Sequence, residues 1–280
     1  MRVYSGLPAG GPTAGIFFTR WITHFVAPAF AFLAGTGAFF LGRKLDDRAA
    51  LSRYLVSRGL VLVLLELTVL REAWTFNLGF AEYDLAGVIW MLGWCMVLMA
   101  ALVRVSTKSL ATFGLLVIFG QQLIPLGVKA LPEPGVNAIG WLLKILYFGG
   151  VFRVGANGPE IAVLFVIVPW IGVMALGYAF GEIMLLDAPR RRSVCLAIGL
   201  SATAIFAVVA TAIVAAHPGG PHAPRGLFRV LGQRKYPASE LFLLMTLGPM
   251  IALIPLAEHA TGVIGRVLST FGRVPMFYYL

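Results

Sequence analysis

Long apolar runs separated by short polar segments dominate the chain. The first run, residues 17–42, holds no charged residue from Phe25 onward. With a rise of about 1.5 Å per residue, a helix of this length crosses a bilayer. Ala34, Gly35 and Gly37 in its second half would let a neighbouring helix approach closely. The pattern predicts a packed membrane helix whose first turns are polar.

Further runs have the same character and cover residues 59–74, 85–103, 110–128, 161–186, 194–216 and 241–256, while residues 275–280 resemble the opening turn of another. Residues 141–152 are apolar but short, so we expect an interfacial or re-entrant segment there. Gln121, Gln122 and Pro125 predict that the outer half of the fourth run is kinked or lines a polar space. We therefore expect an all-α, polytopic transmembrane helix bundle of about seven complete spans plus the start of an eighth.

Composition and charge agree with a membrane protein. Hydrophobic residues make up 59% of the 280 residues and charged residues 12%, whereas about a quarter of a soluble domain is charged. The net charge of +10 includes basic clusters in the polar segments at residues 43–58, 104–108 and 190–192. The positive-inside rule places these segments in the cytoplasm, where they meet anionic lipid. The charge therefore does not indicate nucleic acid, which we do not expect as a partner.

Sequence motifs for metals, nucleotides and covalent catalysis are missing. Cys95 and Cys195 lie inside apolar runs without a CxxC pattern, so both are expected to be core thiols. No HExxH, GxSxG, Walker or GxGxxG pattern occurs. We expect no metal site and no bound cofactor.

Two ionisable residues, Arg20 and His24, mark the predicted outer end of the first run. They lie four positions apart, with Thr23 between them, on one face of a helix. His24 is a candidate general base or proton carrier, or a histidine that only caps the helix or bonds to a neighbouring carbonyl. Arg20 is a candidate ligand for an anionic substrate group, or a side chain that reaches the lipid headgroups.

Glu66 is the most unusual residue of the second run, because an ionisable group inside a bilayer is costly. It is a candidate to hold a proton, to orient His24 or to bind a sugar amine; the alternative is a structural ion pair or hydrogen bond. Asp84 either contacts substrate or caps the third predicted helix. The candidate catalytic residues are His24 and Glu66, and the candidate substrate-binding residues are Arg20, Arg71, Asn77, Asp84 and Lys235.

The inner basic cluster Arg190, Arg191 and Arg192 is a candidate site for the phosphates of a nucleotide-containing donor. The alternative is that these charges only set the topology.

Six stretches occur in an order that resembles bacterial membrane proteins similar to the heparan-alpha-glucosaminide N-acetyltransferase catalytic domain. They are residues 17–37 (FFTRWITHFVAPAFAFLAGTG), 64–77 (LLELTVLREAWTFN), 88–93 (VIWMLG), 169–177 (PWIGVMALG), 235–248 (KYPASELFLLMTLG) and 271–280 (FGRVPMFYYL). Each is degenerate by itself, and the ordered set covers most of the chain.

The resemblance implies one transmembrane acyltransferase-like domain over residues 1–280, lacking its first and last helices. Such proteins pass an acyl group from cytoplasmic acyl-CoA, here acetyl-CoA, to an amino sugar or other saccharide on the opposite face. The active histidine of the animal enzyme falls near Ala14 of this chain, and His24 replaces an acidic residue of that pattern. No catalytic histidine is therefore carried over by the resemblance.

The leading hypothesis is an acyltransferase of the bacterial inner membrane with His24, Arg20 and Glu66 on the acceptor side. Its partners would be the bilayer, a saccharide and acyl-CoA, and self-association as a homo-oligomer is left open. A transporter or exporter of a polar envelope precursor is the alternative, because broken helices and buried charge also suit transport. A purely structural membrane subunit is the third hypothesis.

Overall fold

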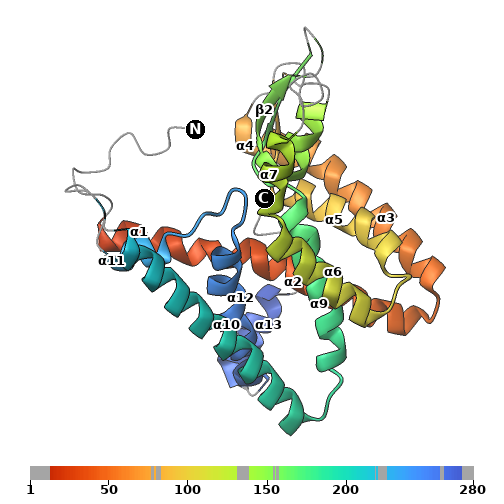
Figure 1. The fold of residues 1–280 in the computed structure, drawn as a ribbon. Helices are drawn as coiled ribbons and strands as arrows, with labels where there is room; N and C mark the ends of the chain where they lie inside the picture. The colour runs from red at the N-terminus through yellow and green to blue at the C-terminus, as the bar shows by residue number, and fades with distance from the viewer. Residues whose placement is uncertain are drawn as a thin grey trace.

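The computed structural model describes residues 13–76, 79, 83–130, 139–153, 155, 158–217, 219, 226–258 and 262–272. These residues are mostly helical (Figure 1). The helices of the first half are α1 (Ala14–Ile22), η1 (Thr23–Phe25), α2 (Val26–Leu45), α3 (Arg48–Leu65), η2 (Glu66–Leu70), α4 (Arg71–Thr75), α5 (Val88–Leu102), α6 (Thr107–Gly120) and α7 (Leu123–Lys129). A helix over Ile139–Phe148 ends in η3 (Lys144–Phe148) and is followed by α9 (Val168–Ile183), α10 (Ala188–Ala216), α11 (Gly226–Leu231), α12 (Glu240–Ala257) and α13 (Gly262–Gly272).

Three helical segments are long and apolar enough to cross a membrane: Ala14–Leu45, Ala188–Ala216 and Glu240–Ala257. They match the first, sixth and seventh predicted runs. The bent pair α6 and α7 would add a fourth span, and its 59° bend confirms the predicted kink. The count of seven spans is not confirmed, because α5 and α9 have 15 and 16 residues and a span needs about 20.

A small three-stranded sheet corrects the expectation of an all-α chain. Strands β1 (Tyr83–Ala86), β2 (Gly150–Arg153) and β3 (Glu160–Val163) lie in the order β1-β3-β2. β1 pairs in parallel with β3, and β2 pairs antiparallel with β3. The predicted third and fifth helices therefore start too early, since their first residues belong to β1 and β3. The sheet rises above one end of the helices in Figure 1.

Two predicted polar segments are in fact helical. The loop predicted for residues 43–58 ends at Asp47, whose Oδ1 accepts a hydrogen bond from the backbone N–H of Ala49 at 2.7 Å and caps α3. The basic residues 190–192 lie in the first turns of α10, which begins at Ala188 and is capped by Asp187. In each case an aspartate just before the basic residues starts the helix. The predicted opening turn at residues 275–280 lies outside the described residues.

Small residues set the distance between the helices, as predicted for the first span. A Cβ atom added to Gly35 of α2 would lie 2.0 Å from the Met174 carbonyl oxygen of α9. A Cβ on Gly177 would lie equally close to the Phe32 carbonyl oxygen. The Thr36 hydroxyl donates to the Gly177 carbonyl oxygen at 2.8 Å across the same contact. Gly37 has nothing within 4 Å and is not part of it.

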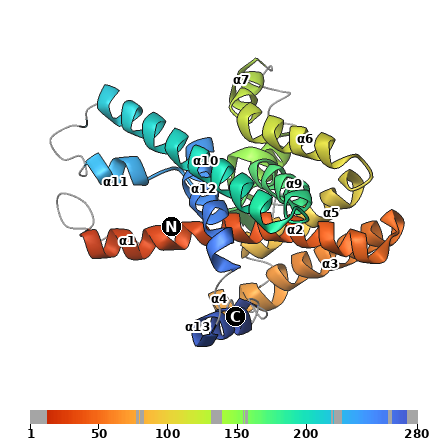
Figure 2. The same ribbon diagram turned by 90° about the horizontal axis from the view of Figure 1, so that it is seen from below.

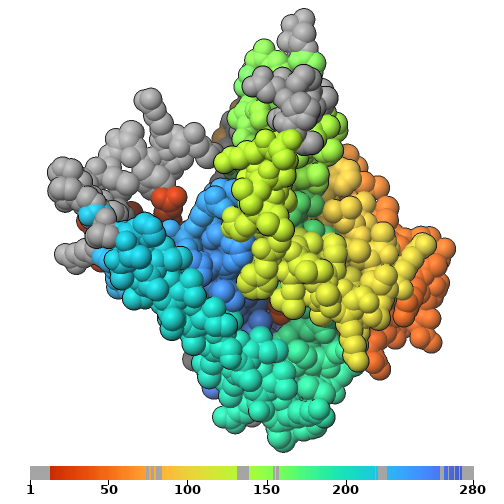
Figure 3. Space-filling model, in the orientation of Figure 1, coloured from red at the N-terminus to blue at the C-terminus, as the bar shows by residue number. Residues whose placement is uncertain are grey.

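The continuous segment formed by α1, η1 and α2 links two groups of helices. α9 packs along α2, α6 packs on α9, and α3 packs on α5, whereas α10 and α12 form a pair on the α1 side (Figures 1 and 2). α10 lies along one edge of the molecule with most of its surface uncovered (Figure 3), as expected of a helix that faces lipid. The polar residues of the first span lie in α1 and η1, where this segment meets α12.

Candidate functional site

A proline breaks the first span at His24. Pro28 has no N–H to donate to the His24 carbonyl oxygen four residues earlier, and its ring crowds that carbonyl. The chain responds with the 3₁₀ turn η1 between α1 and α2. The Thr23 hydroxyl donates to the Arg20 carbonyl oxygen at 2.7 Å within this break. The sequence itself therefore puts Arg20 and His24 next to an irregular part of a spanning helix.

A cavity of about 580 Å³ opens beside this break. Helical residues of α1 and η1 form one wall: Ile16, Phe17, Arg20, Trp21, Thr23 and His24. The loop before α12 forms the other wall: Gly232, Gln233, Arg234, Lys235 and Tyr236. The cavity therefore brings together three of the predicted site residues, Arg20, His24 and Lys235. Arg234 beside them was not predicted; its position next to Lys235 in a Gly- and Pro-rich loop was the available signal.

The loop that carries Lys235 is tied to the helices behind it. The backbone N–H of Ser239 donates to the Arg234 carbonyl oxygen at 3.0 Å, and Gln121 Nε2 donates to the Ala238 carbonyl oxygen at 3.1 Å. Lys235 Nζ lies 5.5 Å from the ring centre of Phe165 and 5.4 Å from that of Tyr236. Burial lowers the pKa of Lys235, and the Arg20 charge lowers it further. The two cations therefore act on each other across the cavity.

His24 is half-buried, and its ring packs edge-on against Phe242 of α12, with ring centres 5.5 Å apart. Its Nδ1 is shielded from solvent and has no hydrogen-bond partner among the described residues. Trp21 one turn earlier donates from Nε1 to Met245 Sδ at 3.4 Å. α12 thus fixes both rings at the edge of the cavity.

Glu66 lies in a separate cluster and is not among the residues that line the cavity. It is 3% exposed, and its Oε2 accepts from the backbone N–H of Ile89 at 3.2 Å. The N-cap of α5, Gly87, has no side chain to satisfy the free amides there. Glu66 caps α5 from the neighbouring helical segment. The structure does not bring Glu66 to His24.

Arg71 and Asp84 complete this second cluster. The Arg71 side chain is fully buried, and its Nε lies 3.1 Å from Asp84 Oδ1 in β1. Arg71 Nη2 donates to the Gly79 carbonyl oxygen at 2.8 Å, and Nη1 lies 3.8 Å from Glu72 Oε2. Burial raises the pKa of Asp84, and the Arg71 charge offsets part of the increase. Asp84 therefore pairs with Arg71 and does not cap α5, so that alternative is wrong.

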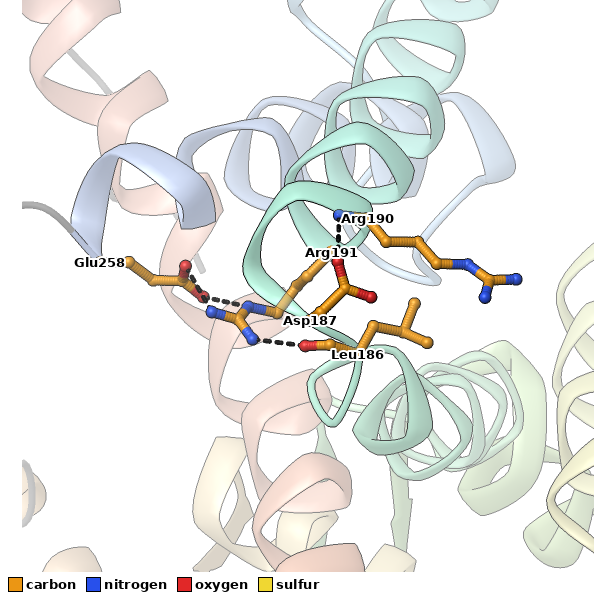
Figure 4. A network of polar contacts seen from close by, with 5 residues as sticks. All are labelled: Leu186, Asp187, Arg190, Arg191 and Glu258. Atoms are coloured by element: carbon orange, nitrogen blue, oxygen red, sulfur yellow. Dashed lines mark hydrogen bonds and ion pairs between the residues drawn. The ribbon is translucent and has the colours of Figure 1, made fainter.

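Two of the candidate donor-binding arginines, Arg190 and Arg191, point away from each other (Figure 4). Arg191 Nε and Nη2 donate to Glu258 Oε1 and Oε2 at 2.7 and 2.9 Å, and Nη1 donates to the Leu186 carbonyl oxygen at 2.7 Å. The side chains of Arg190 and Arg192 are exposed. Arg191 thus links the start of α10 to the end of α12, which leaves its two neighbours facing outward.

Two other observations bear on the predicted site. Arg53 and Arg104, at the predicted inner ends of α3 and α5, line a further open cavity of about 530 Å³ with Ser52 and Ser57. Asn77 lies outside the described residues. Among the described residues, no three His, Cys, Asp or Glu side chains are grouped so that they could hold a metal ion.

The comparisons with known proteins give one match. A family model described as "Heparan-alpha-glucosaminide N-acetyltransferase, catalytic" matches residues 10–213. No curated protein and no solved structure matches the chain. The matched region contains Arg20, His24 and the Glu66 cluster, whereas the cavity loop with Lys235 lies beyond it.

Proposed function

The chain belongs to the heparan-alpha-glucosaminide N-acetyltransferase catalytic family, and on this premise we propose that it is a multi-pass membrane acetyltransferase. In this proposal acetyl-CoA donates on the cytoplasmic side and a saccharide accepts on the outer side. The three apolar helices of spanning length support membrane insertion. The shorter helices α5 and α9 would cross within the bundle, packed on α3 and α2.

The cavity beside η1 carries the proposal for the acceptor. Arg20, His24 and Lys235 come from two distant parts of the chain and meet there. His24 would remove the proton of the accepting hydroxyl or amine, and the two cations would hold the saccharide. Proton transfer by a positioned side chain contributes about 10²–10⁴-fold to a rate. Glu66, Arg71 and Asp84 would act at a distance, by fixing α4, α5 and β1.

The donor side rests on the basic residues of the predicted inner face. Arg190 and Arg192 are exposed at the start of α10 and are candidates for the phosphates of CoA, while Arg191 is bonded to Glu258. Arg53 and Arg104 beside the 530 Å³ cavity are further candidates. Arginine suits phosphate because its donors form a fork.

The test is acetyl transfer by purified protein in vesicles. Labelled acetyl-CoA is supplied on the cytoplasmic face of the protein, and saccharide acceptors are supplied on the opposite face. We expect His24→Ala to lower the rate at least about 100-fold. His217→Ala is the matched control, because the His217 side chain is exposed at the end of α10 and contacts only the Ile213 carbonyl oxygen one turn earlier. Absence of transfer would refute the transferase, and equal loss in both variants would refute a proton-transfer role for His24.

Transport remains the second candidate, because two spanning segments are broken: one at η1 and one at the 59° bend between α6 and α7. Broken helices recur at the binding sites of transporters. Flux of a labelled saccharide through the same vesicles without acetyl-CoA would favour transport over transfer.

A further inference from the structure

We propose that the acceptor is an anion and that it is acetylated on oxygen. Its class is a hydroxyl-bearing sugar acid or phosphate, or the headgroup of an anionic lipid. The acetylation step in this inference rests on the proposed transferase function. The preference for an anionic ligand is inferred only from the residues that line the cavity.

The charge of the cavity wall points to this class. The described lining residues include three cations, Arg20, Arg234 and Lys235, and no Asp or Glu. An ammonium group on an amino sugar would meet like charge on both walls, whereas a carboxylate or phosphate would be attracted by both. A cavity of about 580 Å³ is large enough for a monosaccharide unit.

Among the described residues, no carboxylate forms an ion pair within 4 Å of Arg234 or Lys235. Arg234 lies near the hydroxyl of Tyr147, and its charge lowers the pKa of that hydroxyl against the larger, opposite effect of burial. Lys235 lies over the rings of Phe165 and Tyr236. The carboxylate of Glu240 accepts hydrogen bonds from Gln122 Nε2, at 2.8 and 3.0 Å, and is not among the residues that line the cavity. A bound anion would pair with the two cations of the loop.

The chemistry of a hydroxyl acceptor also fits His24. A hydroxyl must lose its proton as it attacks, so it needs a general base, and the His24 imidazole lines the cavity. In the step, the C–S bond of acetyl-CoA breaks and a C–O bond to the acceptor forms. The hydroxyl proton passes to His24, and the proton that His24 later releases balances the one gained by the CoA thiolate.

Binding without a donor tests the charge preference. The probes are methyl glucuronide, methyl glucoside and methyl glucosaminide, titrated by calorimetry into protein in phosphatidylcholine vesicles. We expect the glucuronide to bind about tenfold more tightly than the glucoside, which corresponds to one partly screened charge contact, and the glucosaminide to bind most weakly. Lys235→Gln should remove most of this preference. Lys129→Gln is the control, because Lys129 is exposed on α7 and does not line the cavity.

Tighter binding of the glucosaminide, or a glucuronide preference that survives the double variant R234Q/K235Q, would overturn the charge preference. Both results are independent of catalysis.

Transfer from labelled acetyl-CoA tests the atom that is acetylated. Mild alkali releases label from an ester and leaves it in an amide, so we expect alkali-labile product on the glucuronide.

Vesicles with phosphatidylglycerol, whose headgroup carries hydroxyls beside a phosphate, separate the two sources of the acceptor. Label in the lipid fraction identifies the headgroup, and label in the water fraction identifies the sugar acid. Alkali-stable label on the glucosaminide would overturn O-acetylation while upholding the transferase. No label in any acceptor would refute the transferase and the O-acetylation step with it, while the binding result would still decide the charge preference.

Discussion

The two clusters of charged side chains differ in their burial and in their ion pairs. In the cluster of Glu66, Arg71 and Asp84 the guanidinium is fully buried and has carboxylate partners. In the cavity cluster the Arg20 side chain is exposed, Lys235 is half-buried, and none of the described lining residues carries a carboxylate. The guanidinium of the buried cluster is paired with carboxylates of the same cluster, whereas the cavity cluster has space for a ligand.

The difference teaches how to distinguish structural from functional charge in an apolar chain. In the sequence, Arg20 and Arg71 both look like an arginine at the end of a membrane helix. A buried charge is tolerated only with close partners, so removing one partner is costly. A charge beside a water-accessible cavity costs little to keep and little to remove. The two clusters should therefore respond oppositely to mutation, in stability and in activity.

Arg71→Met should have the largest effect on stability. It leaves the Asp84 carboxylate without its 3.1 Å partner and should cost about 3–5 kcal/mol in the free energy of unfolding. The measurement is guanidinium unfolding in detergent micelles, followed by tryptophan fluorescence. Arg20→Met is the matched control and should cost less than about 1 kcal/mol. Equal losses in the two variants would mean that the two clusters are not different in kind.

Gly87→Ala should have a smaller effect that depends on Glu66. A Cβ at residue 87 would lie 2.2 Å from Glu66 Oε1, so the capping carboxylate must move, at about 1–3 kcal/mol. In a Glu66→Ala background the same substitution should cost less, and the double-mutant cycle measures the coupling. Gly37→Ala is the control, because nothing lies within 4 Å of that position. Additive effects in the cycle would show that Glu66 does not cap α5.

The apolar runs and the prolines predicted the long helices and the bend, because these features depend on residues close together in the sequence. The first, sixth and seventh runs form helices of spanning length, and Pro125 bends the fourth. Strands β1 and β3 were missed because each has only four residues and joins an apolar run that continues as helix. Their pairing joins Tyr83 to Glu160, a long-range contact that has no local signal.

The site was predicted in part for the same reason. Arg20 and His24 share a helical face, so their spacing was enough to group them. Lys235 reaches them from a loop whose position depends on Gln121 and α12, and the pattern could propose it only as a separate candidate. Glu66 was expected to support His24, but the amides that bind it belong to the start of α5. Which partner satisfies a buried carboxylate depends on the packing of distant segments.

The smallest expected effect concerns Lys235 and pH. Burial and the Arg20 charge lower its pKa in the folded protein below the ordinary value of 10.5. Between the lowered pKa and 10.5 the unfolded chain therefore binds more protons at this residue than the folded protein does. Its contribution should thus favour folding increasingly as the pH rises through that window, by no more than about 1 kcal/mol, since the side chain is only partly buried.

Unfolding of the wild type and of Lys235→Met, compared from neutral pH to pH ~10.5, should show a wild-type curve that rises relative to the variant. Lys129→Met, at an exposed position, should follow the wild type. If the Lys235→Met curve ran parallel to that of the wild type, the Arg20 charge would not act on Lys235 in the folded protein. The cavity cluster and the Arg71 cluster would then differ only in how deeply their charges are buried.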